Sequence, residues 1–205
     1  EEIVVALFKN KPNLVYLNLS NNQLSSDVGK MLANALCKNN TLTSLDLYLN
    51  KLGSESGIAL ANALHKNNSL TFLDISYNGL GFSGGNALVN ALYNNNTLTT
   101  IDLSNNELRS DIGKTLELFF SGKVLASALC KNKGLTSLDL SYNILGNDIE
   151  KDLVEVFHTN TTLTTLKFNG NEFNPEIAKQ LVEKIKIKSN SLDIEMDSDN
   201  DSTVT

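Results

Sequence analysis

Four aspartates recur at one position of a repeated sequence frame. They are the strongest candidates in the chain for a binding or catalytic site. They are Asp46, Asp74, Asp102 and Asp139, each set between two aliphatic residues. Asn18 and Lys167 hold the same position in the first and last copies of the frame. If the copies form adjacent strands, carboxylates about 5 Å apart repel by about 1 kcal/mol even in bulk water. Such a column should raise the pKa of some of these carboxyl groups.

Two interpretations of this column are open. Either the aspartates form an acidic stripe for a basic partner, or their side chains splay into water and serve no partner. Flanking aromatic residues favour the first, because aromatic residues are over-represented at binding hot spots. The candidate partner-binding residues, on the face that the strands expose, are Tyr16, Asp46, Tyr48, Phe72, Asp74, Tyr77, Asp102, Asp139 and Tyr142.

A catalytic centre is not expected. His65 and His158 are too far apart in the repeat to share a site, and no Ser/His/Asp or Cys/His set converges. The glycine-rich segment 79–85 lacks the Gly-Lys-Ser/Thr ending of a phosphate loop, and no Cys/His cluster has zinc spacing. A hydrolase with two column aspartates would need a pocket. We therefore expect no enzyme activity, no metal and no cofactor.

The aspartates must be positioned by the frame Leu-x-x-Leu-x-Leu-x-x-Asn, which recurs along the whole chain. Its closing asparagines are separated by steps of 28, 28, 28, 37 and 28 residues and are Asn22, Asn50, Asn78, Asn106, Asn143 and Asn171. A period of this length is typical of a solenoid. The alternating Leu-x-Leu core predicts a short strand in each copy, and successive strands should stack as a parallel sheet.

A helix is predicted between successive strands. The segment from Gly57 to Leu64 spaces its apolar residues as one helix face, and similar segments follow Gly29 and Gly85. The candidate N-cap residues are Ser26, Ser54, Ser83, Ser110, Asn147 and Asn174. Because a helix is about 10–12 Å wide and strands lie about 4.8 Å apart, the stack should fan into a horseshoe with strands concave and helices convex.

Asparagine recurs at two kinds of position. The frame asparagines should point inward and satisfy buried backbone groups of the turn. Triplets of the type Asn-x-Ser/Thr begin at Asn39, Asn67, Asn95 and Asn160. They allow glycosylation, but their regular spacing favours a role in the turn between helix and strand.

The repeats resemble the leucine-rich repeat family. The helix in each 28-residue unit and the Gly-x-x-Leu-Ala-x-Ala-Leu segments are similar to the ribonuclease-inhibitor-like subfamily, and Asn-Asn-Thr-Leu-Thr-x-Leu-Asp-Leu-Ser is similar to repeats of NOD-like receptors. The resemblance implies an α/β fold, a right-handed solenoid with a parallel concave sheet and convex helices. It does not select one function, because the family includes nuclease inhibitors, GTPase activators, actin regulators and innate sensors.

Residues 1–196 are predicted to form one leucine-rich repeat domain that begins within a repeat. It should contain six full strands, a final helix over Pro175–Lys188 and a C-terminal edge strand over 191–196. Aligning the long step with the others places an insert at 115–123. Residues 197–205 are expected to be an acidic, disordered tail.

Charge and cysteine usage restrict the partners. The net charge is −6 and Arg109 is the one arginine, so nucleic acid is not an expected partner and a basic protein is favoured. Cys37 and Cys130 stand three repeats apart, beyond disulfide reach. With no signal peptide or membrane span visible, we expect a cytoplasmic protein. It should be a monomer or an end-to-end dimer.

The sequence therefore predicts a protein-interaction module that binds a protein partner on its concave face. One alternative is a regulator of an enzyme, such as a small-GTPase activator, with Arg109 as the candidate finger residue. Another is a structural segment of a larger sensor or effector protein.

Overall fold

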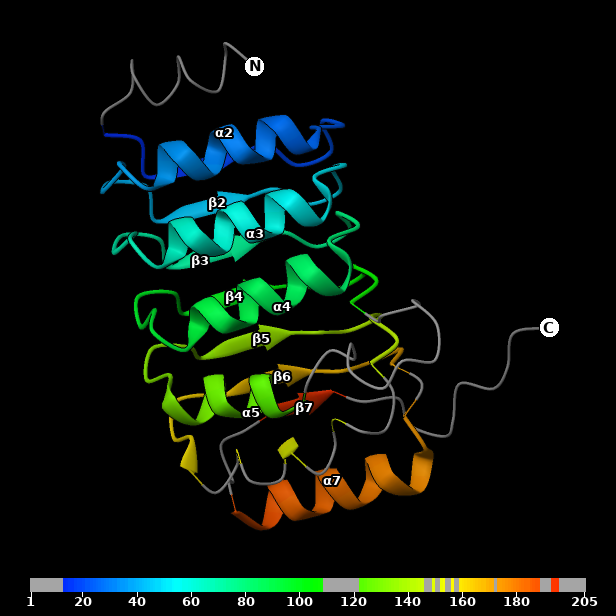
Figure 1. The fold of residues 1–205 in the computed structure, drawn as a ribbon. Coiled ribbons are helices and arrows are strands. Elements are labelled where there is room, and N and C mark those ends of the chain that lie inside the picture. Colours follow the sequence, from blue (N-terminus) through cyan, green and yellow to red (C-terminus); the bar gives the residue numbers. More distant parts are fainter. Residues whose placement is uncertain are drawn as a thin grey trace, which may run out of the picture.

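Seven short strands form one parallel sheet, in the order in which they occur in the chain (Figure 1). The computed structural model describes residues 13–108, 122–145, 149, 152–153, 156, 159–171, 173–188 and 193–195. The strands are β1 (Tyr16–Asn18), β2 (Ser44–Asp46), β3 (Phe72–Asp74), β4 (Thr100–Asp102), β5 (Ser137–Asp139), β6 (Thr165–Lys167) and β7 (Asp193–Glu195). The predicted stack of six strands and a C-terminal edge strand is thus observed.

Helices form a second layer that covers one face of this sheet (Figure 1). They are α2 (Ser26–Leu36), α3 (Gly53–Leu64), α4 (Gly81–Leu92), α5 (Gly122–Lys131) and α7 (Pro175–Lys188). The sheet's other face carries no layer of described helices. Because each helix is wider than the strand spacing, the helical side is the outer, convex side of the stack.

The strands stack without any shift in register. The central residues of the first six strands therefore lie side by side and are buried: Leu17, Leu45, Leu73, Ile101, Leu138 and Leu166. The pairing of β4 with β5 keeps this register although their connection is the long one. A single core of stacked aliphatic side chains fills the space between sheet and helices.

Glycine allows the helices to pack closely. A Cβ placed on Gly57 would lie 2.7 Å from the Cα of Gly84 in the next helix. Real Cβ atoms do not approach a backbone atom so closely, so any side chain at Gly57 would force α3 and α4 apart. The glycine that recurs in the helical segments is therefore a packing residue.

The frame asparagines point inward and close the turn after the strands, as predicted. This holds for the five that are almost completely buried, which are Asn50, Asn78, Asn106, Asn143 and Asn171. The Nδ2 of Asn106 donates to the carbonyls of Leu103 (3.1 Å) and Ile75 (3.0 Å), one in its own repeat and one in the preceding repeat. Its Oδ1 accepts a 3.0 Å bond from the N–H of Asn78. The asparagines therefore link each repeat to its neighbour.

Asn22 does not follow this pattern, so the prediction that it points inward is wrong. Asn22 is exposed, and its Nδ2 donates a 2.8 Å hydrogen bond to the carbonyl of Ser20. The described part of the chain begins at residue 13 and holds no earlier strand whose carbonyls Asn22 could reach.

A second row of asparagines holds the opposite end of the strands. The Nδ2 of Asn67 donates to the carbonyls of Leu36 (2.9 Å) and Asn39 (2.8 Å), and its Oδ1 accepts from the N–H of Leu70 (2.8 Å). Asn95 and Asn132 make the matching bonds one and two repeats later. Because Asn67 and Asn95 are buried, the turn interpretation of their triplets is confirmed.

Three of the expected N-cap residues lie inside helices instead. Ser26, Ser54 and Ser83 belong to the first turns of α2, α3 and α4, which begin at or before them. The first N–H of α3 is satisfied by the next repeat, because Gly53 donates a 3.0 Å bond to the carbonyl of Asn78. Gly81 does the same with Asn106 at 2.9 Å. A side-chain cap is therefore not needed at these two helices.

Of the three remaining predicted N-cap residues, one is confirmed and two lie outside the described residues. Asn174 precedes α7, and its Oδ1 accepts a 3.0 Å bond from the N–H of Glu176, as an N-cap residue should. Ser110 and Asn147 lie outside the described residues.

Parts of the predicted domain organisation also fall on residues that the structure does not describe. Of the predicted insert at 115–123, Gly122 and Lys123 belong to α5, and residues 115–121 lie outside the described residues. The same holds for residues 1–12, Arg109, His158 and the tail 197–205. Among the helices that the structure describes, none is long and apolar enough to cross a membrane.

Candidate functional site

The strand register places the four column aspartates on consecutive strands of the exposed sheet face. Asp46, Asp74, Asp102 and Asp139 pair in that order along β2, β3, β4 and β5. Asn18 precedes them on β1, and Lys167 and Glu195 follow on β6 and β7. We call Asp46, Asp74, Asp102 and Asp139 the aspartate column.

Each column residue also has a structural task, which sequence reasoning missed. One oxygen of Asp74 accepts hydrogen bonds from the N–H of Ser76 at 3.0 Å and from its Oγ at 2.6 Å. The other three aspartates accept the N–H two residues later at 2.8–3.0 Å. The carboxylates thus hold the turn after each strand and do not splay into water. The second oxygen of each carboxylate takes no part in this turn bond.

The column has a polar neighbour at one end and a charged neighbour at the other. On β1, the Nδ2 of Asn18 donates a 2.8 Å hydrogen bond to Oδ2 of Asp46. On the far side, the Nζ of Lys167 lies 2.8 Å from a carboxylate oxygen of Glu195. Lys167 also attracts the carboxylates of Asp139 and Asp102, so it offsets part of the negative charge on β4 and β5.

Two of the column carboxyls have a raised pKa, which is the direction predicted for stacked like charges. Burial raises the pKa of Asp102 to about 6, with Asp139 and Asp74 adding to the rise and the hydrogen bonds from Ser104 opposing it. The pKa of Asp74 is also raised, again chiefly by burial. The direction was predicted, but loss of hydration is the larger cause and repulsion the smaller one.

The aromatic candidates fall into two groups on this face. Tyr16 and Phe72 belong to a second column of the same strands, where Ser44 separates them. Tyr48, Tyr77 and Tyr142 instead lie in the turns that follow β2, β3 and β5. The rings of Tyr48 and Tyr77 meet edge to face with centroids 5.5 Å apart, and an added Cβ at Gly170 would collide with the ring of Tyr142.

The turn after the strands requires a left-handed backbone at one repeated position. Its occupants in the first six repeats are Asn21, Leu49, Tyr77, Asn105, Tyr142 and Gly170, with φ between 52° and 67°. Asparagine and glycine adopt this conformation readily, whereas leucine and tyrosine do so at a cost of about 1–2 kcal/mol. Leu49 is thus a candidate that sequence reasoning missed. Asn and Gly at the matching positions were the signal that could have revealed it.

Tyr48, Leu49 and Tyr77 form one exposed group, which we call the turn-edge cluster. The N–H of Tyr48 donates a 3.0 Å bond to Oδ1 of Asp46, so the cluster adjoins the aspartate column directly. The structure therefore brings together an apolar group and a row of carboxylates on one face.

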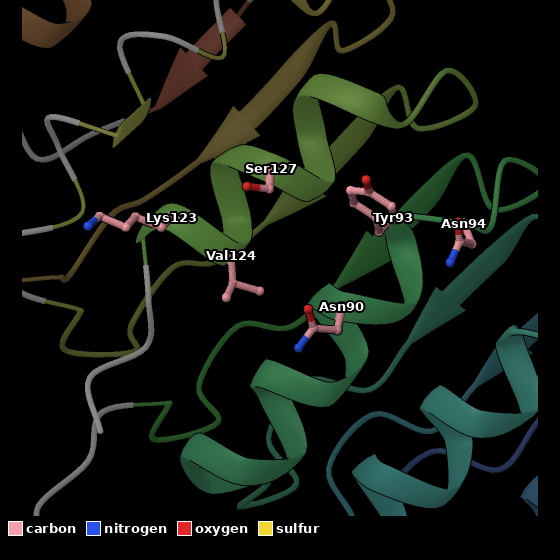
Figure 2. A pocket seen from close by; sticks show the side chains of 6 residues that line it. All are labelled: Asn90, Tyr93, Asn94, Lys123, Val124 and Ser127. Carbon is pink, nitrogen blue, oxygen red and sulfur yellow. The ribbon is translucent and has the colours of Figure 1, made fainter. Parts of the chain in front are cut away.

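A separate hollow of about 430 Å³ opens on the convex side, between α4 and α5. Figure 2 shows its lining side chains, which are Asn90, Tyr93, Asn94, Lys123, Val124 and Ser127. The Nζ of Lys131 lies 4.2 Å from the centre of the Tyr93 ring. None of the predicted site residues lines this hollow, which faces away from the aspartate column.

Catalytic and metal-binding arrangements are not found among the residues described. No group of three or more His, Cys, Asp or Glu side chains there could hold a metal ion. Both cysteines are free, and neither lies in the aspartate column.

Family models identify the repeat. Models described as leucine-rich repeats match residues 13–35, 38–61, 66–89, 94–116 and 159–182, which together make up more than half of the chain. The chain is a leucine-rich repeat protein. Its predicted family and fold class are therefore confirmed, and the matched ranges include β1, β2, β3, β4 and β6 with the residues that follow them.

Solved structures that are similar to this chain include two domains. One, named as actin-binding site 2 of leiomodin-1, has 18% sequence identity and a TM-score of 0.53, over 91% of this chain and 89% of that one. The other, the C-terminal domain of a tropomodulin from Caenorhabditis elegans, has 14% identity and a TM-score of 0.49, over 90% of each chain. No curated protein matches the leucine-rich repeat chain. At 18% identity, the likeness to the leiomodin-1 domain shows a shared fold and no more.

Proposed function

We propose that this leucine-rich repeat protein is a protein-interaction module that binds a protein partner on its concave face. The observation that carries the proposal is the in-register column of four carboxylates beside exposed aromatic side chains. The proposed partner-binding residues are those of the aspartate column together with Tyr16, Tyr48, Phe72, Tyr77 and Tyr142.

Rigidity of the face supports this proposal. Asparagine side chains tie neighbouring repeats together at both ends of the strands, as Asn106 and Asn95 do. A preformed surface loses little conformational entropy when it binds. The side chains of the face can therefore contribute most of their contact energy to the affinity.

The negative charge of the column supports a basic partner. Opposite charges across an interface speed association and exclude like-charged competitors. The solved neighbour that carries the name of an actin-binding site shows that this fold can present a surface to another protein. We carry over the class of function and not that partner.

The remaining expectations belong to the same proposal. We place the chain in the ribonuclease-inhibitor-like subfamily, because a helix follows each strand in the regular 28-residue units. A cytoplasmic location and a non-enzymatic role are proposed on the sequence arguments given above. The GTPase-activator alternative gains no support, since Arg109 lies outside the described residues.

Affinity capture tests the proposal. The chain and a variant with Asp46, Asp74, Asp102 and Asp139 all changed to Asn would be immobilised, and captured proteins identified by mass spectrometry. Asparagine keeps the turn bond, as Asn18 shows by accepting from the N–H of Ser20 at 2.8 Å. The variant should therefore fold and lose the partner.

A matched control removes the same charge from the helical side. It changes Asp27, Glu55, Glu176 and Glu183, which are exposed on α2, α3 and α7, to Asn or Gln. This control should capture the partner as the parent does. Equal capture by the parent and the concave variant would refute binding through the aspartate column.

A further inference from the structure

The turn-edge cluster offers an apolar contact surface that the fold itself does not require. Tyr48, Leu49 and Tyr77 remain 38%, 40% and 44% exposed. Leu49 and Tyr77 have φ of 52° and 55°, a conformation in which three other repeats carry asparagine or glycine and one carries Tyr142. Their bulky side chains therefore add strain and expose apolar surface without filling the core, which is the pattern of a contact residue.

Charge complementarity indicates what would cover this surface. The cluster adjoins the aspartate column through the bond between the Tyr48 N–H and Asp46. Lys167, the one cation in the described register of that column, already pairs with Glu195. A segment that covers both features must carry cationic side chains in a row and apolar side chains beside them.

The spacing of the column selects the conformation of that segment. Strands lie about 4.8 Å apart, so four carboxylates on consecutive strands span roughly 14 Å. Side chains on one face of a helix recur about every 5.4 Å, so four successive ones span roughly 16 Å. Those on one face of an extended strand recur about every 6.7 Å and span roughly 20 Å. Lysine or arginine side chains would have to absorb a mismatch of roughly 2 Å on a helix and roughly 6 Å on a strand, so the helix is the better match.

We propose that the concave face binds an α-helix of a partner protein, lying across strands β2 to β5. One stripe of lysine or arginine side chains on this helix faces the aspartate column. Apolar side chains on the adjoining stripe contact Tyr48, Leu49 and Tyr77. This inference rests on the proposed function and deepens it by stating the class of partner segment.

Three synthetic peptides of about 20 residues, long enough to be helical when rich in alanine, would test it. The first carries lysines at i, i+4, i+7 and i+11, which form one stripe, with leucines on the adjoining stripe. The second has the same composition with the lysines scattered around the helix. The third keeps the lysines and leucines of the first but contains prolines that prevent a helix. Affinity for the full chain would be measured by titration calorimetry, and peptide helicity by circular dichroism.

The striped peptide should bind about 10-fold more tightly than either of the others, equivalent to about 1.4 kcal/mol. Tyr77→Asn and Leu49→Asn should each weaken its binding by about 10-fold, because both residues would contact its leucines. Tyr93→Asn is the matched control, since Tyr93 is 39% exposed but lies beside the convex hollow. It should leave the affinity unchanged.

Each other outcome has a definite meaning. Equal binding of all three peptides would overturn the helical inference. Unchanged affinity in Tyr77→Asn and Leu49→Asn, with both variants folded by circular dichroism, would overturn the role of the cluster. If no peptide binds but affinity capture finds a partner that the concave variant loses, this inference fails and the proposed function stands. If capture also shows no dependence on the column, both fail.

Discussion

The backbone N–H of Asn106 donates a 2.9 Å hydrogen bond to Oδ1 of Asn143, although the two residues are 37 positions apart. The matching bond from Asn78 to Asn106 joins residues 28 positions apart and is 3.0 Å long. The longer connection therefore leaves the asparagine ladder intact. The aspartate column also stays continuous across β4 and β5, where Asp102 pairs with Asp139.

Replacing Asn106 with alanine should lower the free energy of unfolding by about 1–3 kcal/mol, because it leaves buried backbone groups without partners. These groups include the carbonyl of Ile75 and the N–H of Asn78, both bonded to the Asn106 side chain at 3.0 Å. Urea denaturation would measure the change. Asn22→Ala is the control and should cost much less, since Asn22 is exposed. Equal losses in the two variants would contradict the ladder.

Gly57→Ala should destabilise the protein by about 1–3 kcal/mol through overpacking, although alanine favours a helix. Its new Cβ would lie 2.7 Å from the Cα of Gly84, and backbone cannot move aside cheaply. The comparison is Asn62→Ala, at an exposed position of the same helix α3, which should be neutral or stabilising. Thermal denaturation of both variants would separate helix propensity from packing. A more stable Gly57→Ala protein would refute the close contact.

Leu49→Asn should keep or raise the free energy of unfolding, by up to about 1 kcal/mol, because asparagine tolerates a left-handed backbone. Asn21 and Asn105 already occupy the matching position with φ of 56° and 53°. The measurement is again urea denaturation. A clear loss of stability would show that Leu49 serves the fold, and would remove the argument that its side chain is kept for a partner.

Asp102→Asn should stabilise the protein at pH 7 and above but not near pH 3.5. The folded-state pKa of Asp102 is raised to about 6 from 3.8, so the ionised form is disfavoured by folding. Stability therefore falls as pH rises from about 4 to about 6, and above this window the loss is about 1–3 kcal/mol. Asparagine removes the titrating group and keeps the acceptor for the N–H of Ser104, now bonded at 2.8 Å.

The groups that face Asp102 in the column do not reverse this sign. Asp74 and Asp139 flank it on β3 and β5, and both raise its pKa. Lys167 lies one strand further and pairs with Glu195. Denaturation of parent and variant between pH 3.5 and 8 would give the difference directly. A difference that stays constant across this range would contradict the raised pKa.

Repetition made much of this protein predictable. The frame ending in Asn50, Asn78 and Asn106 already determined the order of the strands, their register and the buried leucines, because similar units of equal length must stack in a similar way. The same periodicity placed Asp74 beside Asp102. The final helix at Pro175–Lys188 also followed from local signals, a capping asparagine and a proline at its start.

Only the tertiary structure decided how these residues behave. The turn bond of Asp74, the burial that raises the pKa of Asp102, and the left-handed φ of Leu49 and Tyr77 depend on where neighbouring repeats place their backbone. So does the start of α3, whose first N–H is satisfied by the carbonyl of Asn78 in the next repeat. Residue types and spacing determine which units stack, but hydration, hydrogen bonding and backbone strain are set by distances between atoms of different units.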